Sequence, residues 1–225
     1  MVTESATHTT EWRRETRNGD VDGFIRDRHA EAIRVLNGGR ESGLLGTRGF
    51  MREIDLVDNW IANGLPESER KLWTPDRRAD AALQRLFLSD VKPEEVVEVT
   101  GNILVTAGIA SLLNLLTGAG DTAFSNANAY TGVGDSTTGS SVGQTDLQAA
   151  TNKLRKAMNA TYPALSAPTI QFQSTFGSSE GNYVWNEVGI FNAAAAGTML
   201  NRAVQSLGTK TSGSSWSLTT TLQFA

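Results

Sequence analysis

The sequence predicts an α+β fold, in which a helical N-terminal half is followed by a mainly antiparallel, β-sandwich-like C-terminal domain with one or two helices. The first observation is that charged residues are concentrated in the first half of the chain. Residues 1–100 carry 15 Lys+Arg and 19 Asp+Glu, whereas residues 101–225 carry 5 of each. Periodicity is the second, because apolar residues recur every three or four positions in the first half and every second position near the C-terminus. We therefore expect a charged helical anchoring region at residues 1–98 and a β-rich domain at residues 99–225.

Three helices are expected in the first half, where apolar residues recur at helical spacing over residues 25–36, 50–61 and 74–87. The first segment ends at Asn37-Gly38-Gly39 and the second at Asn63-Gly64, both of which are typical helix stops. Thr74-Pro75 is a helix start, because threonine caps a helix and proline suits its first turn. Loops are expected at Gly43–Gly49 and Leu65–Trp73.

The middle of the chain predicts a change of structure. Ser89–Glu98 is expected to be the linker, and Val96–Val105 to be a strand with a bulge or turn at Gly101-Asn102. Thr106–Leu116 predicts a helix that is buried in protein. Thr145-Asp146 is a candidate cap for a further helix that would extend through Met158.

Strict alternation of apolar and polar residues predicts antiparallel strands in the rest of the chain. It is clearest over residues 170–176 and 216–224, and residues 183–191 and 199–205 complete a plausible sheet. In the closing strand, the residues expected to face a core are Trp216, Leu218, Leu222 and Phe224. Those expected to face solvent or a neighbour are Ser217, Thr219 and Gln223.

Composition excludes several functional classes. The absence of cysteine excludes disulfides, thiolate nucleophiles and Cys-ligated metals. The net charge of −4 lacks the basic excess of a nucleic-acid binder, and clusters such as Arg13-Arg14 and Arg77-Arg78 are interleaved with acids, which predicts solvated faces or inter-subunit ion pairs. No signal-peptide pattern opens the chain, and the apolar stretch Ile103–Leu116 is short for a membrane span, so no membrane partner is expected.

Short motifs do not predict a catalytic, cofactor or metal site. Gly134–Ser141 has the glycine spacing of a phosphate-binding loop, but Ser140 stands where that loop needs a lysine, which favours an exposed turn. Gly132-Val133-Gly134 lacks the third glycine of a dinucleotide fingerprint. His8 and His29 are the only histidines, too few for a zinc site, and no serine lies in a nucleophile elbow.

Two alternatives remain open from the residues of the second half. Its five carboxylates include Glu187, which lies in a strand-like segment and is expected to be partly buried and paired; a polysaccharide-cleaving enzyme would need two of the five at one cleft. A sugar-binding module would instead use Trp185, Trp216 or Tyr183 as an exposed stacking platform. The alternation of their segments favours core positions for both tryptophans. The other four carboxylates are Asp121, Asp135, Asp146 and Glu180.

The second half, about residues 99–225, resembles a group of virion structural proteins of tailed bacteriophages, described as tail, fibre or minor structural proteins. The segments that carry the resemblance are residues 101–108, 127–135, 144–153, 172–176, 185–192, 197–202 and 207–211. Among them, the Asn-Glu-x-Gly-Ile-Phe-Asn stretch followed by Met-Leu-Asn-Arg is similar to collar or fibre modules. The resemblance implies a role in the virion and carries no catalytic residues.

The expected function is therefore that of a non-enzymatic phage virion protein, either a tail or fibre-attachment component or a capsid-decorating one. Its expected partners are other virion proteins of the tail, collar or capsid and further copies of itself, in a ring or trimer. The low charge of the second half and the apolar segment Ile103–Leu116 predict a contact between subunits that buries more than roughly 1,000 Å² of surface. No cofactor and no direct nucleic-acid binding are expected. A host-glycan-binding adsorption module or a small polysaccharide depolymerase is the alternative.

Overall fold

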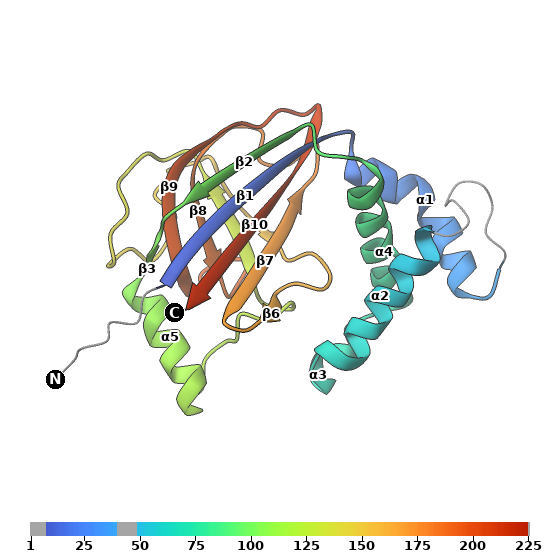
Figure 1. The fold of residues 1–225 in the computed structure, drawn as a ribbon, viewed down its shortest axis with the longest axis horizontal. Coiled ribbons are helices and arrows are strands. Elements are labelled where there is room, and N and C mark those ends of the chain that lie inside the picture. Colours follow the sequence, from blue (N-terminus) through green and yellow to red (C-terminus); the bar gives the residue numbers. More distant parts are fainter. Residues whose placement is uncertain (1–7, 40–48, 225) are drawn as a thin grey trace.

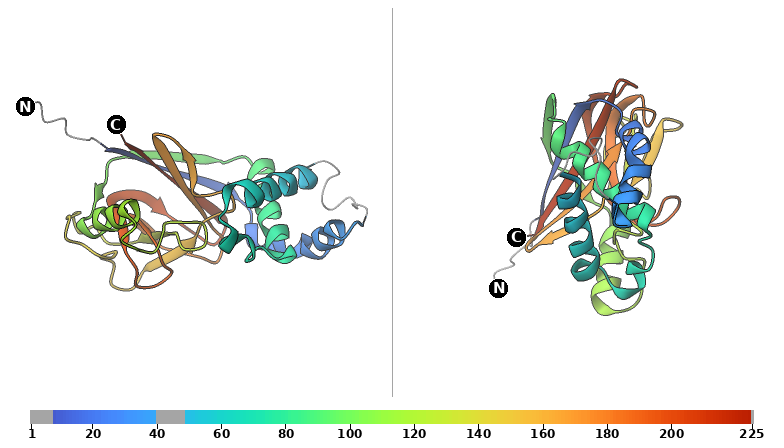
Figure 2. Two further views of the ribbon diagram at one scale, coloured as in Figure 1. Left: turned by 90° about the horizontal axis from the view of Figure 1, so that it is seen from below. Right: turned by 90° about the vertical axis from the view of Figure 1, so that its right-hand side faces the viewer.

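The computed structural model describes residues 8–39 and 49–224, which form an α+β fold with two antiparallel sheets and five helices (Figure 1). This confirms the α+β class and the antiparallel sheets that the sequence predicts. Four helices, α1–α4, lie together at one end of the molecule, and both sheets lie at the other (Figures 1 and 2). We call α1–α4 the helical arm. The expected loop at Gly43–Gly49 lies outside the described residues except for Gly49, which begins a helix.

The first sheet contains a strand that the sequence analysis assigned to the helical half. Its strand order is β2-β1-β10-β7-β6. The bounds are β1 His8–Asn18, β2 Glu95–Thr100, β6 Ala164–Ser166, β7 Thr169–Phe176 and β10 Ser214–Phe224. β1 pairs along its whole length with β10, the last strand of the chain. The expectation of a helical region throughout residues 1–98 is thus wrong for residues 8–18, which alternate between the two faces of a sheet.

The second sheet is built from strands of the C-terminal half alone. Its order is β3-β9-β8-β4-β5, with antiparallel pairing throughout. The bounds are β3 Ile103–Leu104, β4 Tyr130–Gly134, β5 Lys153–Ala157, β8 Val184–Phe191 and β9 Met199–Thr209. β2 and β3 correspond to the strand expected at Val96–Val105. The chain passes from one sheet to the other at Gly101-Asn102, where Gly101 adopts φ +97°, a conformation that favours glycine.

A single hydrophobic core lies between the two sheets. The first sheet contributes Trp12 and Phe176 and the second contributes Trp185, all fully buried. Trp185 makes edge contacts with Phe176 and with Trp216, at ring-centroid distances of 4.7 and 4.9 Å. Such edge-to-face pairs add to the stabilisation from buried area. Both tryptophans that the sequence placed in the core are therefore confirmed there.

The closing strand follows the predicted alternation with two exceptions. Leu218 and Leu222 are buried as expected, but Phe224 is 43% exposed because it lies at the open end of the strand. Ser217, expected to face solvent or a neighbour, is 2% exposed. The outer face of β10 is covered at that point, since Ser217 lines a cleft beside the helical arm and its hydroxyl lies 3.0 Å from that of Thr175.

The helical arm confirms the three expected helices. α1 spans Val21–Leu36, α2 Gly49–Gly64 and α4 Pro75–Asp90, and the expected loop between the last two contains the short α3, Glu67–Arg70. Thr74 caps α4 as predicted, since its hydroxyl accepts a hydrogen bond from the Arg77 N–H at 3.3 Å. A small core of its own holds the arm together, and its fully buried residues are Ala32, Phe50, Ala79, Ala82 and Leu83.

Two expectations for the second half are wrong. Residues 145–158 form no helix: the segment is a loop followed by the edge strand β5. The loop is extended because the backbone N–H groups of Gln148 and Ala149 donate to the buried carboxylate of Glu187, at 2.9 and 2.7 Å. Helix α5, Thr106–Thr117, forms where predicted, but only Gly108 and Ser111 are buried in it.

Candidate functional site

The carboxylate that invited an enzymatic reading, Glu187, is fully buried. Its side chain accepts a hydrogen bond from Nε of Arg202 at 2.8 Å and forms an ion pair with Nη2 of the same guanidinium at 2.7 Å, and neither side chain is exposed. With the two N–H groups of the preceding loop, three hydrogen bonds satisfy this carboxylate. Glu187 thus fixes the loop before β5 to the second sheet and is closed to a polysaccharide substrate.

The other four carboxylates of the second half each have their own local partner. Asp146 pairs with Lys153 and Arg155, which holds its pKa below the usual range despite the opposing effect of burial. Glu180 pairs with Lys156 at 2.6 Å. Asp135 accepts a hydrogen bond from the Asn152 amide and Asp121 from the Thr122 N–H. A glycosidase needs two carboxylates about 5–10 Å apart at one open cleft, and the fully buried Glu187 cannot be one of them.

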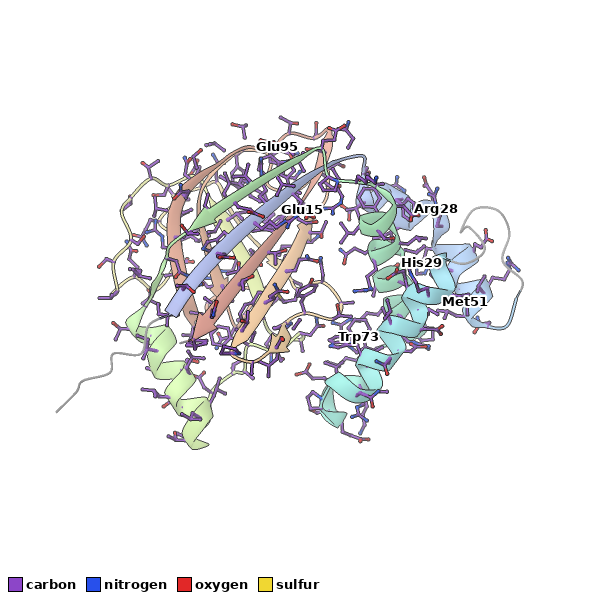
Figure 3. All side chains as sticks on the ribbon, in the orientation of Figure 1. Glu15, Arg28, His29, Met51, Trp73 and Glu95 are labelled. Atoms are coloured by element: carbon purple, nitrogen blue, oxygen red, sulfur yellow. The ribbon has the colours of Figure 1, made fainter. Side chains whose placement is uncertain are left out.

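His29 links two helices of the arm (Figure 3). Its Nδ1 lies 2.7 Å from Asp80 and its Nε2 lies 3.1 Å from Asp76, both on α4. The hydrogen bond with Asp80, followed by that with Asp76, raises the pKa of His29 against the effect of burial. The side chain of His8 lies outside the described residues. Within the described ranges no group of three or more His, Asp and Glu side chains is placed to hold a metal ion.

The glycine-rich loop at Gly134–Ser141 presents a backbone carbonyl oxygen, rather than a row of N–H groups, to the guanidinium of Arg202. Arg202 Nη2 donates to the Thr138 carbonyl at 2.8 Å, and Arg202 Nη1 donates to the Gln144 side chain at 2.9 Å. A phosphate loop does the opposite, because it surrounds an anion with backbone donors. This loop therefore completes the environment of the buried ion pair.

Aromatic residues that a sugar-binding module would expose are held inside. Trp185 is 0% and Trp216 is 3% exposed, and the guanidinium of Arg14 covers the Trp216 ring at 4.2 Å from its centroid. The Tyr183 hydroxyl donates to the Val133 carbonyl at 3.3 Å, and burial raises the pKa of Tyr183 well above its usual range. Both tryptophans are thus unavailable for stacking on a sugar, and Tyr183 is half-buried.

The charges of the first half pair within the chain. Arg13 contacts Glu15 at 2.8 Å, and Arg17 contacts the same carboxylate. A cleft of about 210 Å³ lies between the arm and the first sheet beside Glu15, which Figure 3 shows on β1. On the arm side of this cleft, Arg85 joins Glu53 at 2.9 Å and reaches the Thr161 hydroxyl at 3.0 Å. The contact with Thr161 attaches the arm to the loop between β5 and β6, a role that the sequence analysis did not anticipate.

Helix α5 exposes an apolar surface that no other described part of the chain covers. Ile109, Leu113 and Leu116 are 43%, 55% and 81% exposed and lie at i, i+4 and i+7, on one face of the helix. The opposite face is fixed at Gly108, where an added Cβ would collide with the backbone of Leu200 on β9. α5 itself contains no charged residue. We call the exposed face of this helix the α5 surface.

Two further residues of α5, Leu112 and Leu115, line an open apolar cavity of about 320 Å³. The cavity lies between α5 and the ends of β6, β7 and β10, and two of its lining residues, Leu165 and Phe224, are themselves 79% and 43% exposed. Apart from Thr169 its lining is apolar: Leu112, Leu115, Phe124, Leu165, Pro168, Ile170, Phe172, Leu200, Leu222 and Phe224. An exposed apolar helix face, together with an apolar cavity lined by the same helix, is typical of a protein-binding site.

Sequence reasoning identified the apolar character of α5 but placed it inside the protein. No charged residue lies between residues 101 and 120, and this pattern is shared by a buried helix and by one that binds a partner, so it does not distinguish the two. No protein-family model matches the chain, and no curated protein matches it significantly. None of the helices in the described residues has the length and apolar character needed to cross a membrane.

Proposed function

We propose that the chain is a non-enzymatic structural protein of a tailed-phage virion, a tail or fibre-attachment component or a capsid-decorating one. It works by binding other virion proteins of the tail, collar or capsid and further copies of itself, and it is located in the virion after assembly in the bacterial cytoplasm. The resemblance of residues 99–225 to such proteins supports the virion role. The burial of Glu187, Trp185 and Trp216 supports a structural role over the glycan-cleaving and glycan-binding alternatives.

The α5 surface is the observation that carries this proposal. Moving a leucine side chain from water into a contact contributes about 1.5–3 kcal/mol, so Leu113 and Leu116 together offer several kcal/mol to a partner. Because α5 carries no charge, a different surface of a neighbouring copy can cover it without desolvating a charge on this helix. A closed homo-oligomer, a ring or a trimer, is therefore the assembly that we propose.

In this proposal the two parts of the chain have different tasks. The β-sandwich-like part presents the α5 surface to its neighbours, and the charged helical part anchors the protein on other virion components. The arm exposes charged side chains of both signs, among them Arg26, Asp27, Asp55 and Lys71, which suits a polar contact of modest strength per ion pair. Direct binding of nucleic acid or of a membrane has no part in the proposal.

The self-association is tested with the full chain by size-exclusion chromatography with light scattering. The double substitution Leu113→Lys and Leu116→Lys places cations in the last turn of α5, where they complement the helix dipole and spare the fold. We expect an oligomer for the unmodified chain and a monomer for this variant. The matched control is Leu72→Lys, since Leu72 is 50% exposed and lies outside α5. A monomeric unmodified chain, or an oligomer that survives both lysines, would contradict the proposal.

The virion role is tested separately by immunogold electron microscopy. Antibodies against the purified chain are expected to label a fixed position on particles of the phage that encodes it. Labelling confined to the cell lysate, with unlabelled particles, would refute a structural role in the virion. A glycan-cleaving activity of the purified chain would favour the depolymerase alternative.

A further inference from the structure

Lys210 is a buried cation without a carboxylate in direct contact. It follows β9, is 1% exposed, and its backbone N–H donates to the Tyr183 carbonyl at 3.0 Å. Its Nζ donates to the Gly177 carbonyl at 2.7 Å and to the Asn182 side-chain oxygen at 3.0 Å. Among the described residues, Glu180 is the nearest acid in sequence to these acceptors, but it pairs with Lys156 instead.

This environment makes the neutral amine more accessible than it is in an exposed lysine. A buried charge is costly unless it is paired, and burial lowers the pKa of Lys210 to about 8, although Glu180, Asp22 and Asp20 oppose the shift. The two acceptors match the two N–H groups of a neutral amine, so its lone pair is left without a partner. A desolvated lysine of this kind is an activated nucleophile.

The group beside this amine is an electrophile that can be attacked. The Asn182 carboxamide carbon is one C=O bond from the oxygen that Lys210 contacts, so it lies within about 4.2 Å of Nζ. Attack requires roughly 3–3.5 Å, a small rotation away. The amide nitrogen of Asn182 donates to the Ser178 carbonyl at 2.9 Å, and Asn182 is exposed, so a leaving group has a path to solvent.

A carboxyl group that holds a proton more readily than usual lies next to these residues. Asp22, at the start of α1, sits against Gly177 so closely that a Cβ there would collide with its carboxylate. Burial raises the pKa of Asp22, an effect that Lys156 and Lys210 oppose and that Glu180 and Asp20 reinforce. Asp22 is thus placed beside the Lys210 acceptor and suited to carry a proton.

The geometry points to an intramolecular isopeptide bond between Lys210 and Asn182. Nζ of the neutral lysine attacks the side-chain carbonyl carbon of Asn182, an N–C bond forms, and the bond from that carbon to the amide nitrogen breaks. The proton lost by Nζ passes through the Asp22 carboxyl to the leaving nitrogen, which departs as ammonia. No oxidant or cofactor takes part. The bond would join the start of β8 to the end of β9, and it does not depend on the proposed virion role.

Mass spectrometry of the purified full chain tests this inference. After incubation at pH 9, where Lys210 is neutral, the intact mass is expected to be lower than the sequence mass by one ammonia. Tryptic digestion of the denatured chain should then yield residues 157–202 joined to residues 203–225 as one branched product, because trypsin does not cleave after a modified lysine. A succinimide at Asn37-Gly38 or Asn63-Gly64 would also lose ammonia but would give no branched product.

Variants separate the reaction from an effect on folding, which circular dichroism monitors. Lys210→Arg and Asn182→Ala should keep the sequence mass, whereas Asn182→Asp should lose one water in place of ammonia. Lys153→Arg is the matched control, since Lys153 is an exposed lysine of the same sheet, and it should still form the bond. Asp22→Asn should slow the bond about a hundredfold. An unmodified chain that keeps its full sequence mass, and is cleaved by trypsin after Lys210, would overturn the inference.

Discussion

Replacing Glu187 with glutamine should destabilise the protein more than any exposed carboxylate substitution does. Glutamine keeps the volume but loses the negative charge, so the fully buried guanidinium of Arg202 is left without its counter-ion. The new amide N–H₂ group would also meet the N–H groups of Gln148 or Ala149, where the carboxylate now accepts at 2.9 and 2.7 Å. Donor would then face donor in a site without access to water.

The expected magnitude follows from these lost contacts. Removing one partner of a buried pair costs about 3–5 kcal/mol because the other charge is left uncompensated. Arg202→Met should cost a similar amount, and it also frees the carbonyl of Thr138. In the double variant no buried charge is left unpaired, so its cost should be smaller than the sum of the two single costs. That difference is the coupling energy of the pair.

Urea unfolding followed by tryptophan fluorescence measures these costs, since Trp185 and Trp216 lie in the core. With a slope near 3 kcal/mol per molar urea, Glu187→Gln should lower the midpoint by roughly 1–2 M. The control is Glu98→Gln, whose carboxylate is 68% exposed and contacts Arg13 at 3.5 Å, and its effect should stay below about 1 kcal/mol. Equal midpoints for the two glutamine variants would refute the structural role of Glu187.

Two further predictions concern the helices. Gly108→Ala should lower the free energy of unfolding in urea by about 1–3 kcal/mol, because the new methyl group collides with the backbone of Leu200. The control Gly139→Ala meets open space and should be neutral. Equal effects of the two substitutions would contradict the close contact of α5 and β9. His29 should stabilise the arm more at pH 6 than at pH 9, because its folded-state pKa is raised above the ordinary value near 6.5. The stabilisation is complete below about pH 6.5 and is lost as the pH rises through the folded-state pKa. The unfolding free energy of the His29→Gln variant should accordingly approach that of the unmodified chain at pH 9, and a constant difference would rule out the contribution of the charged imidazole.

Local signals in the sequence were sufficient for most of the helices and for the closing strand. The Thr74 cap predicts the start of α4, and the donor to its hydroxyl lies within the same turn. The alternation of Leu218 and Leu222 predicts β10, because a half-buried strand separates its two faces by polarity alone. In each case the information that specifies the element lies within a few residues of it.

Elements that depend on distant partners could not be predicted in the same way. β1 has charged residues on both faces, so its local pattern does not resemble a half-buried strand. The buried position of Arg14 becomes acceptable only because its guanidinium covers Trp216 and contacts Glu95 at 2.8 Å. The helix expected at residues 145–158 is absent because Glu187, about 40 residues away, takes the backbone N–H groups that a helix would use. Neither partner is visible from the local pattern.

The candidate site illustrates the same limit. The apolar character of α5 is plain in the sequence, and burial is the usual fate of such a helix. Its exposure follows from Gly108, which fixes one face of the helix to β9 and so turns Leu113 and Leu116 outward. Lys210 and Asn182 likewise meet only because β8 and β9 pair, which no local spacing predicts.

The edges of the two sheets favour α5, rather than strand addition, as the site of the proposed self-association. An unpaired edge is a general route to assembly, and charged side chains block it. The edge strand β5 carries Lys153, Arg155 and Lys156, while the edge strand β2 carries Glu95 and Glu98. The other two edges, β3 and β6, are only two and three residues long. A copy that added a strand would therefore meet either charges or too short an edge, whereas a copy that packed against α5 would meet an uncharged helix with exposed Ile109, Leu113 and Leu116.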